Sequence, residues 1–449
     1  MTPPAAGRLP LAERLLRLAA AEGASDAEVV VMATDAALTR FANSEIHQNV
    51  AETDVVASLR FVAGRRAGVA SSGRLDGDGL RALAETAARI AHVQPELDDP
   101  VVLPEPGLIP EVTGAWNEST AGATPERRAD GVRQVVAEAE AARVLAFGSF
   151  ATLTDGLTVA NSRGIRAEQV TTQGRLIAIC MGPDGEAGYG EAMAVDVTSI
   201  DPSAVGREAA GRAVRSRAPA ALPPGVYPVV LEPYAVVDLL DWIGELGFSA
   251  LAVEEGRSFY EPGRPIASAL VSTWDDATDP SGTPMAFDYE GVGKQRVPLI
   301  ERGTCAGLVY DAATAGRAGL RSTGHGLPAP NTRGPIPTNQ FMAPGETAPE
   351  ELLAGMPRGL LVTRFNYTNA VHPKRAIVTG MTRDGTFLVE HGEIVGPVRN
   401  LRFTQSYLDA LAGVEAVGRE RRLLAGELGS CVVPGLRIAA WDFTGATEH

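Results

Sequence analysis

Three carboxylates on one predicted helix are the most direct candidates for chemistry in this chain. Pro233 opens the helix at its first turn, and Asp238, Asp241 and Glu245 recur along one side of it. A predicted strand over residues 227–232 leads into the helix. Carboxylates in this position could hold a metal ion or act as an acid/base pair. A solvated polar face is the simpler interpretation, and it is the one we expect.

Histidine is the residue type that would turn this helix into a metal centre. A metalloprotease helix needs two imidazoles on one face and a carboxylate that activates water. The six histidines of the chain form no such pair, and none occurs between His92 and His325. The predicted helix therefore lacks the residues for a catalytic metal site of its own.

His325 and Cys431 are two further candidates for a site. His325 lies between Gly324 and Gly326, so a ligand could approach closely and the imidazole could titrate near neutral pH. An exposed loop histidine is the simpler expectation. Cys431 could act as a nucleophile only beside a basic partner, and the sequence shows none. We therefore expect Cys431 to be a small buried hydrophobic residue.

Other motifs give little support to alternative chemistries. Asp275, Asp276 and Asp279 crowd a turn that could bind a cation, but the spacing of a calcium loop is missing, and we expect an acidic turn. The chain contains no Gly-x-Ser-x-Gly elbow of a serine hydrolase. Its glycine-rich pieces lack the later glycine of a dinucleotide fingerprint.

The composition is that of a soluble globular protein, with 45% apolar and 21% charged residues. Forty basic against fifty-five acidic residues give a net charge of -15 without a Lys/Arg block, which disfavours nucleic-acid binding. No signal peptide or apolar membrane span is predicted. Three widely separated cysteines suit reduced thiols. We therefore expect a cytoplasmic protein that binds neither nucleic acid nor membrane.

The elements that would position these residues predict an α+β fold with two domains. Residues 1–218 are expected to form an N-terminal domain in which strands followed by a helix occur twice, in sub-units of about 1–95 and 120–218. The Ala-Asn-Ser at residues 42–44 is repeated at residues 160–162. The sequence therefore predicts a pseudo-duplicated antiparallel sheet with helices.

A linker rich in proline and small residues is predicted at 219–225. After it, residues 226–449 carry one helix and then short strands separated by turn signals, which predicts a mostly antiparallel β barrel or sandwich. The proline-rich stretch between Gly324 and Gly359 has little periodicity. A loop of that length is usually functional or bound to a partner.

Several segments of the second half resemble one protein family. The segments are Phe287-Asp-Tyr-Glu-Gly-Val292, Ser322-Thr-Gly-His-Gly326, Asn339-Gln-Phe-Met-Ala-Pro-Gly345 and Thr379-Gly-Met-Thr-Arg-Asp-Gly385. Together with residues 41–46 near the N-terminus, they resemble the TldD/PmbA family over nearly the full chain. The resemblance implies a two-domain protein that works as a TldD-TldE type heterodimer. In such pairs the TldD-like subunit binds the catalytic zinc through a His-Glu-x-x-x-His helix and a later cysteine.

Carrying that motif over by residue indicates which subunit this chain resembles. The two imidazole positions fall on Asp241 and Leu246, and the carboxylate position falls on Trp242. Cys431 lies near the place of the third ligand, but the residues that follow it do not match. The resemblance therefore implies a TldE/PmbA-like subunit without metal ligands or catalytic residues, which closes the substrate chamber of its partner. The implied cofactor is zinc in the partner, and the implied substrate is an extended peptide or a small amide.

Two alternatives to this subunit role remain open. The chain could be a stand-alone amidase or N-deacetylase, or it could be a non-enzymatic binding or regulatory module. The residues that would line a cleft or face a partner in any of these cases are Asp241, Glu245, His325 and Cys431.

Overall fold

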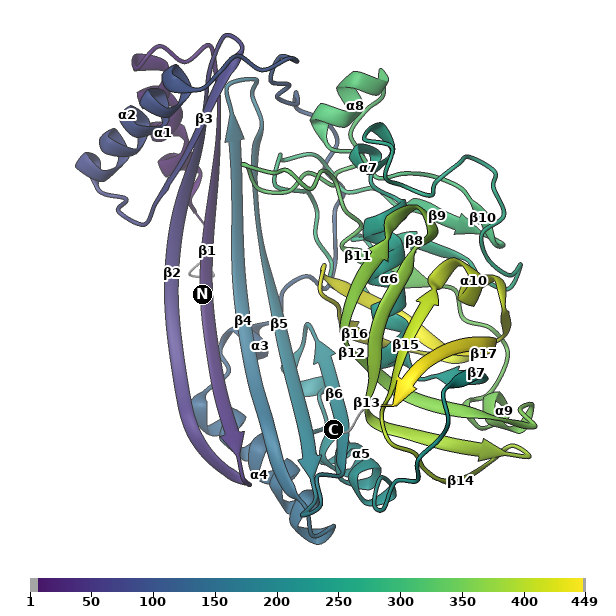
Figure 1. The fold of residues 1–449 in the computed structure, drawn as a ribbon. Helices are drawn as coiled ribbons and strands as arrows, with labels where there is room; N and C mark the ends of the chain where they lie inside the picture. The colour runs from purple at the N-terminus through teal and green to yellow at the C-terminus, as the bar shows by residue number, and fades with distance from the viewer. Residues whose placement is uncertain (1–6, 447–449) are drawn as a thin grey trace.

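The computed structural model describes residues 7–446, so the outermost residues of both predicted domains lie outside it. Two sheets lie side by side in a mixed α+β fold, as predicted (Figure 1).

The N-terminal sheet has six strands in the order β3-β2-β1-β4-β5-β6. Its strands are β1 (Asp26–Ala42), β2 (Glu45–Ala63), β3 (Arg66–Ser72), β4 (Leu145–Asn161), β5 (Arg166–Met181) and β6 (Ala187–Ala194). The helices of this part are α1 (Leu9–Ala21), α2 (Gly77–Val93), α3 (Glu118–Ala121), α4 (Pro125–Ala141) and α5 (Pro202–Arg215), with a 3-10 turn η1 (Val197–Ser199).

The N-terminal sheet is built from two similar halves, which confirms the predicted pseudo-duplication. Each half runs helix, three antiparallel strands, helix, and the halves join where β1 pairs antiparallel with β4. The repeated Ala-Asn-Ser lies at the first hairpin turn of each half. In the first half, Asn43 and Ser44 form a two-residue turn with φ values of 52° and 63°. Such a turn matches the twist of the strands it joins, so the repeat marks the same structural position twice.

One face of β4, β5 and β6 is covered by helices and the other faces the C-terminal sheet (Figure 1). Val135 of α4 and Ala209 of α5 pack with Phe150 and Ala178 in one core cluster. Thr124 caps α4 by accepting a hydrogen bond from the backbone N–H of Arg127. Because side chains alternate along a strand, the intervening residues of β4 and β5 point into the space between the sheets.

The C-terminal sheet has eleven strands, and most of its pairings are antiparallel. Its strands are β7 (Gly225–Leu231), β8 (Thr273–Asp275), β9 (Val297–Glu301), β10 (Thr304–Cys305), β11 (Asn339–Met342), β12 (Arg358–His372), β13 (Ile377–Glu390), β14 (Glu393–Pro397), β15 (Leu401–Ser406), β16 (Val414–Ala425) and β17 (Ser430–Ala446). Its helices are α6 (Pro233–Gly247), α7 (Ala250–Glu254), α8 (Ala312–Ala318), α9 (Pro349–Ala354) and α10 (Tyr407–Ala412), with a 3-10 turn η2 (Pro373–Arg375). Strand β7 pairs with both β12 and β17. The strand pairings therefore form a closed cycle through β17, β15, β13, β12 and β7. Strands β12, β13 and β17 are 15, 14 and 17 residues long, and so they are not the short strands predicted.

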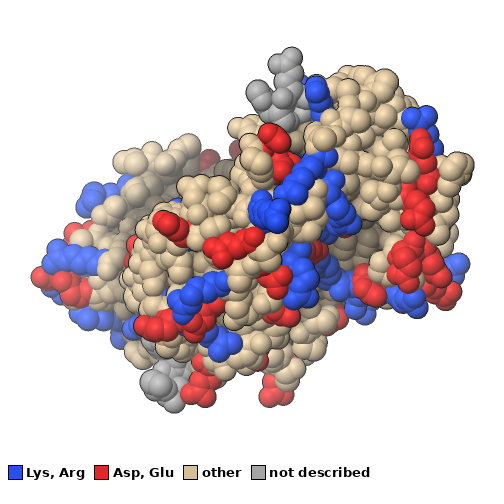
Figure 2. Space-filling view, turned by 90° about the horizontal axis from the view of Figure 1, so that it is seen from below, with Lys and Arg blue, Asp and Glu red and all other residues tan. Residues whose placement is uncertain are grey.

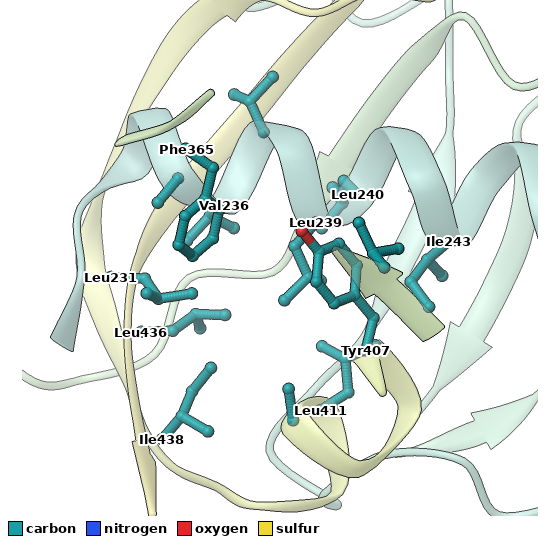
Figure 3. Packing of buried hydrophobic residues seen from close by; sticks show 14 of the residues in the cluster. Leu231, Val236, Leu239, Leu240, Ile243, Phe365, Tyr407, Leu411, Leu436 and Ile438 are labelled. Carbon is teal, nitrogen blue, oxygen red and sulfur yellow. The ribbon is translucent and has the colours of Figure 1, made fainter. Parts of the chain in front are cut away.

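Helix α6 packs its apolar side against the strands of the C-terminal sheet (Figure 3). Leu240 and Ile243 are buried in the largest core cluster, which also contains Leu436 and Ile438 of β17. Gly247 ends the helix, and a Cβ there would lie 2.0 Å from the ring of Phe259. The side of α6 that faces this sheet is therefore apolar, and Gly247 marks a close contact.

The loop between Gly324 and Gly359 contains more regular structure than predicted, because β11 and α9 both lie within it. Residues 219–225 connect α5 to the start of β7. Within residues 7–446, no helix is both long and apolar enough to cross a bilayer. One face of the molecule carries Lys and Arg interspersed with Asp and Glu (Figure 2).

Candidate functional site

Asp241 lies in a covered position on the polar side of α6, with only 6% of its surface exposed. Its Oδ2 accepts a hydrogen bond of 2.7 Å from the backbone N–H of Glu427, in the turn between β16 and β17. Its Oδ1 lies 3.4 Å from Gln340 Nε2 and 3.8 Å from Cys431 Sγ. The predicted solvated face is therefore wrong at Asp241, because a turn from the far end of the chain folds over this part of the helix.

Asp238 lies one turn earlier on the same side of α6 and is held by two hydroxyl groups. Its Oδ2 accepts from Thr368 Oγ1 at 2.6 Å, and its Oδ1 accepts from the Tyr407 hydroxyl at 2.6 Å. Part of its surface stays open to a cavity, yet the surrounding protein still desolvates the carboxyl group. Burial raises the pKa of Asp238 to about 6 and that of Asp241 to about 7. The two carboxyl groups can therefore hold or release protons near neutral pH.

Glu245 lies apart from these two carboxylates. It is half-buried and forms an ion pair of 2.7 Å with Arg333, which belongs to the proline-rich loop and is largely exposed. Its side chain lines none of the cavities described below. Glu245 therefore fastens the loop to α6 at the surface.

His325 is 1% exposed, so the expectation of an exposed loop histidine is wrong. Its Nε2 lies 2.9 Å from Asp275 Oδ1, and its Nδ1 lies 2.9 Å from Thr323 Oγ1. Burial and the nearby Lys294 lower the pKa of His325, so its imidazole is neutral at neutral pH. The histidine is thus a buried hydrogen-bonding residue of the loop interior.

Asp275 is completely buried, so the predicted acidic turn is wrong at this residue. Strand β8 places it between β9 and β11, where its Oδ2 accepts from the backbone N–H of Asn339 at 2.7 Å. Burial alone would raise the pKa of Asp275, but His325 and Lys294 hold it below its ordinary value. Asp279 does form a turn, in which its Oδ1 accepts from the backbone N–H of Ser281.

Strand β11 connects the buried pair to α6. Gln340 lies opposite Asp275 in the pairing with β8, and beside Cys431 in the parallel pairing with β17. Its side chain reaches Asp241. Three of the four predicted site residues, Asp241, Cys431 and His325, are therefore linked through Gln340 and Asp275. Sequence reasoning missed both links, although Gln340 belongs to a segment that carries the family resemblance.

Two cavities lie between the sheets near α6. The smaller has a volume of about 450 Å³ and is lined by Asp238, Asp241 and Glu427 from the C-terminal part, together with Arg175 and Glu191 of β5 and β6. The larger has a volume of about 550 Å³ and lies against β1, β4 and β5. Nothing in the local sequence of β5 or β6 signals these contacts, because they depend on how the sheets pack.

The residues at α6 do not fit a zinc site. The donors that meet there are one carboxyl group and one thiol, Asp241 and Cys431. Burial and the neighbouring Asp241 raise the pKa of the Cys431 thiol well above its ordinary value, which opposes the thiolate that zinc requires. Leu246 is buried in the core, and Trp242 donates its Nε1–H to Thr368. Across the part of the chain that the structure describes, no group of three or more His, Cys, Asp or Glu side chains could hold a metal ion.

We predict that Cys431 reacts slowly with thiol reagents in the folded protein. Cys431 is 1% exposed, as expected for a small buried residue. Cys180 is buried as well, and its burial raises the pKa of its thiol to about 12. Native labelling with iodoacetamide followed by peptide mass spectrometry should find Cys431 unmodified, and labelling in urea should modify it fully. Rapid labelling of Cys431 in the native state would contradict this placement.

Stability should depend on pH through Asp241. Its folded-state pKa of about 7 lies above the ordinary value of 3.8, so the folded chain holds this proton more tightly than the unfolded chain does. The stabilising contribution is therefore complete below the unfolded pKa and is lost as pH rises through the folded pKa. The free energy of unfolding of Asp241→Asn, measured relative to that of the native chain, should therefore increase by on the order of 2–3 kcal/mol when the pH is raised from about 5 to about 8. Urea denaturation at both pH values measures this, and an unchanged difference would refute it.

The fold and site define a mixed α+β protein in which a helix with buried carboxylates faces a second sheet across a cleft. Two family models match this chain. The PmbA/TldA metallopeptidase C-terminal domain matches residues 224–445, and the PmbA/TldA metallopeptidase domain 1 matches residues 27–91. The chain belongs to the TldD/PmbA family.

Curated relatives match parts of the chain. A metalloprotease of Methanothermobacter thermautotrophicus is 28% identical over 203 residues, which are 44% of this chain and 43% of the relative. A metalloprotease TldD homolog of Buchnera aphidicola is 26% identical over 180 residues, 39% of this chain and 36% of the relative. Each match thus spans less than half of the relative's own length.

Solved structures share the whole fold. TldE from Thermococcus kodakarensis superposes with a TM-score of 0.87 at 19% identity, covering 97% of this chain and 100% of that chain. A candidate modulator of DNA gyrase from Thermotoga maritima superposes with a TM-score of 0.85 at 21% identity, covering 96% of this chain and 99% of that one. At these identities the likeness establishes the fold.

Proposed function

We propose that this chain is the TldE/PmbA-like subunit of a heterodimeric TldD-TldE type metallopeptidase or amide hydrolase. In this proposal a TldD-like partner binds the catalytic zinc, and this chain completes the chamber around an extended peptide or a small amide. The observation that carries the proposal is that the three positions on α6 where the family motif would stand are occupied by residues with other structural roles. Asp241 bonds to a backbone N–H, Trp242 bonds to Thr368, and Leu246 is buried in the core.

Further observations support this role. The likeness to a solved TldE covers 97% of this chain and the whole of that chain. We propose residues 1–218 and 226–449 as the two domains, joined through 219–225. The three cysteines are free and buried, which supports a location in the reducing cytoplasm.

The proposal is tested by co-expressing a tagged copy of this chain with a TldD-like subunit. We expect an equimolar complex on size-exclusion chromatography, because the chain then completes its partner's chamber. If this chain elutes alone although the co-expressed partner is folded, that result would contradict the heterodimer.

A stand-alone amidase or N-deacetylase has less support. It would use Asp241, Glu245, His325 or Cys431, but Glu245 lies at the surface and His325 is enclosed away from either cavity. Our proposal predicts that Glu245→Gln and Cys431→Ala each leave hydrolysis by the reconstituted pair unchanged. A loss of turnover, with the complex still formed, would favour chemistry in this chain. A non-enzymatic binding or regulatory module would instead bind a folded target, and a pull-down with this chain would recover no zinc-binding partner.

A further inference from the structure

One face of β5 forms a continuous wall along both cavities. Helices cover the face that carries Ala178, so the alternate residues point toward the C-terminal sheet. Along that face, Gln169, Thr171 and Gln173 line the larger cavity and Arg175 lines the smaller one. These positions span about 20 Å, at roughly 3.3 Å per residue.

The neighbouring strand follows the same pattern. On β6, Met193 lines the larger cavity and Glu191 lines the smaller one. Ala425, at the end of β16, contributes to both linings. The two cavities are therefore adjoining parts of one elongated cleft, and the turn between β16 and β17 lines both of them.

The larger cavity suits an apolar molecule. Its volume of about 550 Å³ lies within the usual range of small-ligand sites, which often occur between domains. Methionine and leucine side chains from the N-terminal sheet and from loops of the C-terminal part line it, and methionine side chains adapt to ligands of different shape. They are Met32, Leu153, Met193, Met285 and Leu428.

Two polar groups on the wall of the larger cavity are available to a ligand. Within the described residues, the side chains of Thr171 and Gln173 make no hydrogen bond, and both are half-buried. They could therefore bond to amide or hydroxyl groups of a molecule that lies along β5.

The smaller cavity carries an excess of negative charge. Its arginines are already paired, because Arg175 Nε lies 2.8 Å from Glu191 and Arg364 Nε lies 2.6 Å from Asp384. Asp238, Asp241 and Glu427 have no cationic partner among the described residues. Two of these three carboxyl groups are shielded from bulk water, where attraction to a cation is stronger than in solvent.

We propose that this cleft binds an elongated apolar molecule that carries a primary ammonium group. The apolar part would occupy the larger cavity, and the ammonium group would lie beside Asp238, Asp241 and Glu427. A peptide amino terminus and a long-chain amine share this chemistry. The site lies wholly within this chain, so it goes beyond the proposed subunit role and requires no zinc-binding partner.

The test uses the full chain and a hexapeptide of apolar residues with a free amino terminus and a fluorophore at its carboxyl end. Fluorescence anisotropy should show saturable binding, and acetylation of the amino terminus should weaken it about tenfold or more. Displacement by decylamine would assign the site to amines in general, whereas binding without displacement would assign it to peptides. Absence of saturable binding, or equal affinity for the acetylated peptide, would overturn the proposal.

Variants locate the site within the cleft. Thr171→Trp should weaken both peptides about tenfold or more, because the indole fills the larger cavity. Asp241→Asn should weaken only the peptide with the free amino group. Gln48→Trp, on the exposed part of β2, is the matched control and should bind as the native chain does. Native affinity in Thr171→Trp, with its unfolding midpoint unchanged, would exclude this cleft as the site.

Discussion

Replacing Arg212 with alanine is expected to destabilise the protein by about 3–5 kcal/mol, because it leaves the partly buried Glu232 without its cation and Glu208 with Arg422 alone. The Arg212 side chain is 6% exposed, and its Nη1 lies 2.7 Å from Glu208 Oε1. Its Nη2 lies 2.8 Å from Glu232 Oε1, at the residue that immediately precedes α6. Its Nη1 also donates to the carbonyl oxygen of Tyr189. Arg212 thus ties α5 and β6 of the N-terminal part to the start of the helix that carries the site.

The control is Arg207→Ala on the same helix. Arg207 is 67% exposed in its side chain and pairs with Glu138 at 3.2 Å, so its loss should change stability by less than about 1 kcal/mol. Urea denaturation of both variants measures the difference. Similar losses for Arg207→Ala and Arg212→Ala would show that burial of the Arg212 ion pairs does not set their strength.

Replacing Trp441 with alanine is expected to cost about 3–5 kcal/mol, from lost apolar contact and the cavity left behind. Trp441 is completely buried in the core beneath α6. Its ring stacks on Phe365 at 4.9 Å between centroids and lies 5.6 Å from Tyr407. Because Tyr407 donates its hydroxyl to Asp238, the change should also loosen one wall of the smaller cavity.

The two consequences of Trp441→Ala are measured separately. Urea denaturation gives the loss of stability, and near-ultraviolet circular dichroism reports the packing of the aromatic rings. Trp441→Phe retains an aromatic ring and should cost clearly less. Equal costs for the phenylalanine and alanine variants would mean that ring packing at this position contributes little.

Local sequence signals predicted the elements whose stability is local. The strand before α6 and the start of that helix at Pro233 followed from periodicity and from a proline suited to a first helical turn. The repeated Ala-Asn-Ser predicted the duplicated half-sheets because it marks the same hairpin turn in each. These features depend on residues a few positions apart, which a single sequence displays directly.

The site depends on contacts between distant residues, and the sequence predicted it only in part. Asp241 is covered by a backbone group 186 residues further along the chain, so its periodic position on α6 could not distinguish burial from solvation. The pairing of His325 with Asp275 joins a loop residue to a strand residue 50 positions earlier in the chain, which no local pattern encodes. The family resemblance supplied the positions on α6, but not the cleft formed by β5 and β6.

Zinc content and hydrolysis of the separated subunits test the central proposal most directly. This chain, its TldD-like partner and the reconstituted pair would each be purified, analysed for zinc by mass spectrometry, and assayed on an unfolded peptide substrate with and without chelator. We predict that this chain alone carries no stoichiometric zinc and hydrolyses nothing, whereas the pair contains zinc and loses its activity with chelator. Stoichiometric zinc in this chain alone, together with chelator-sensitive hydrolysis, would contradict its assignment as the subunit without metal ligands.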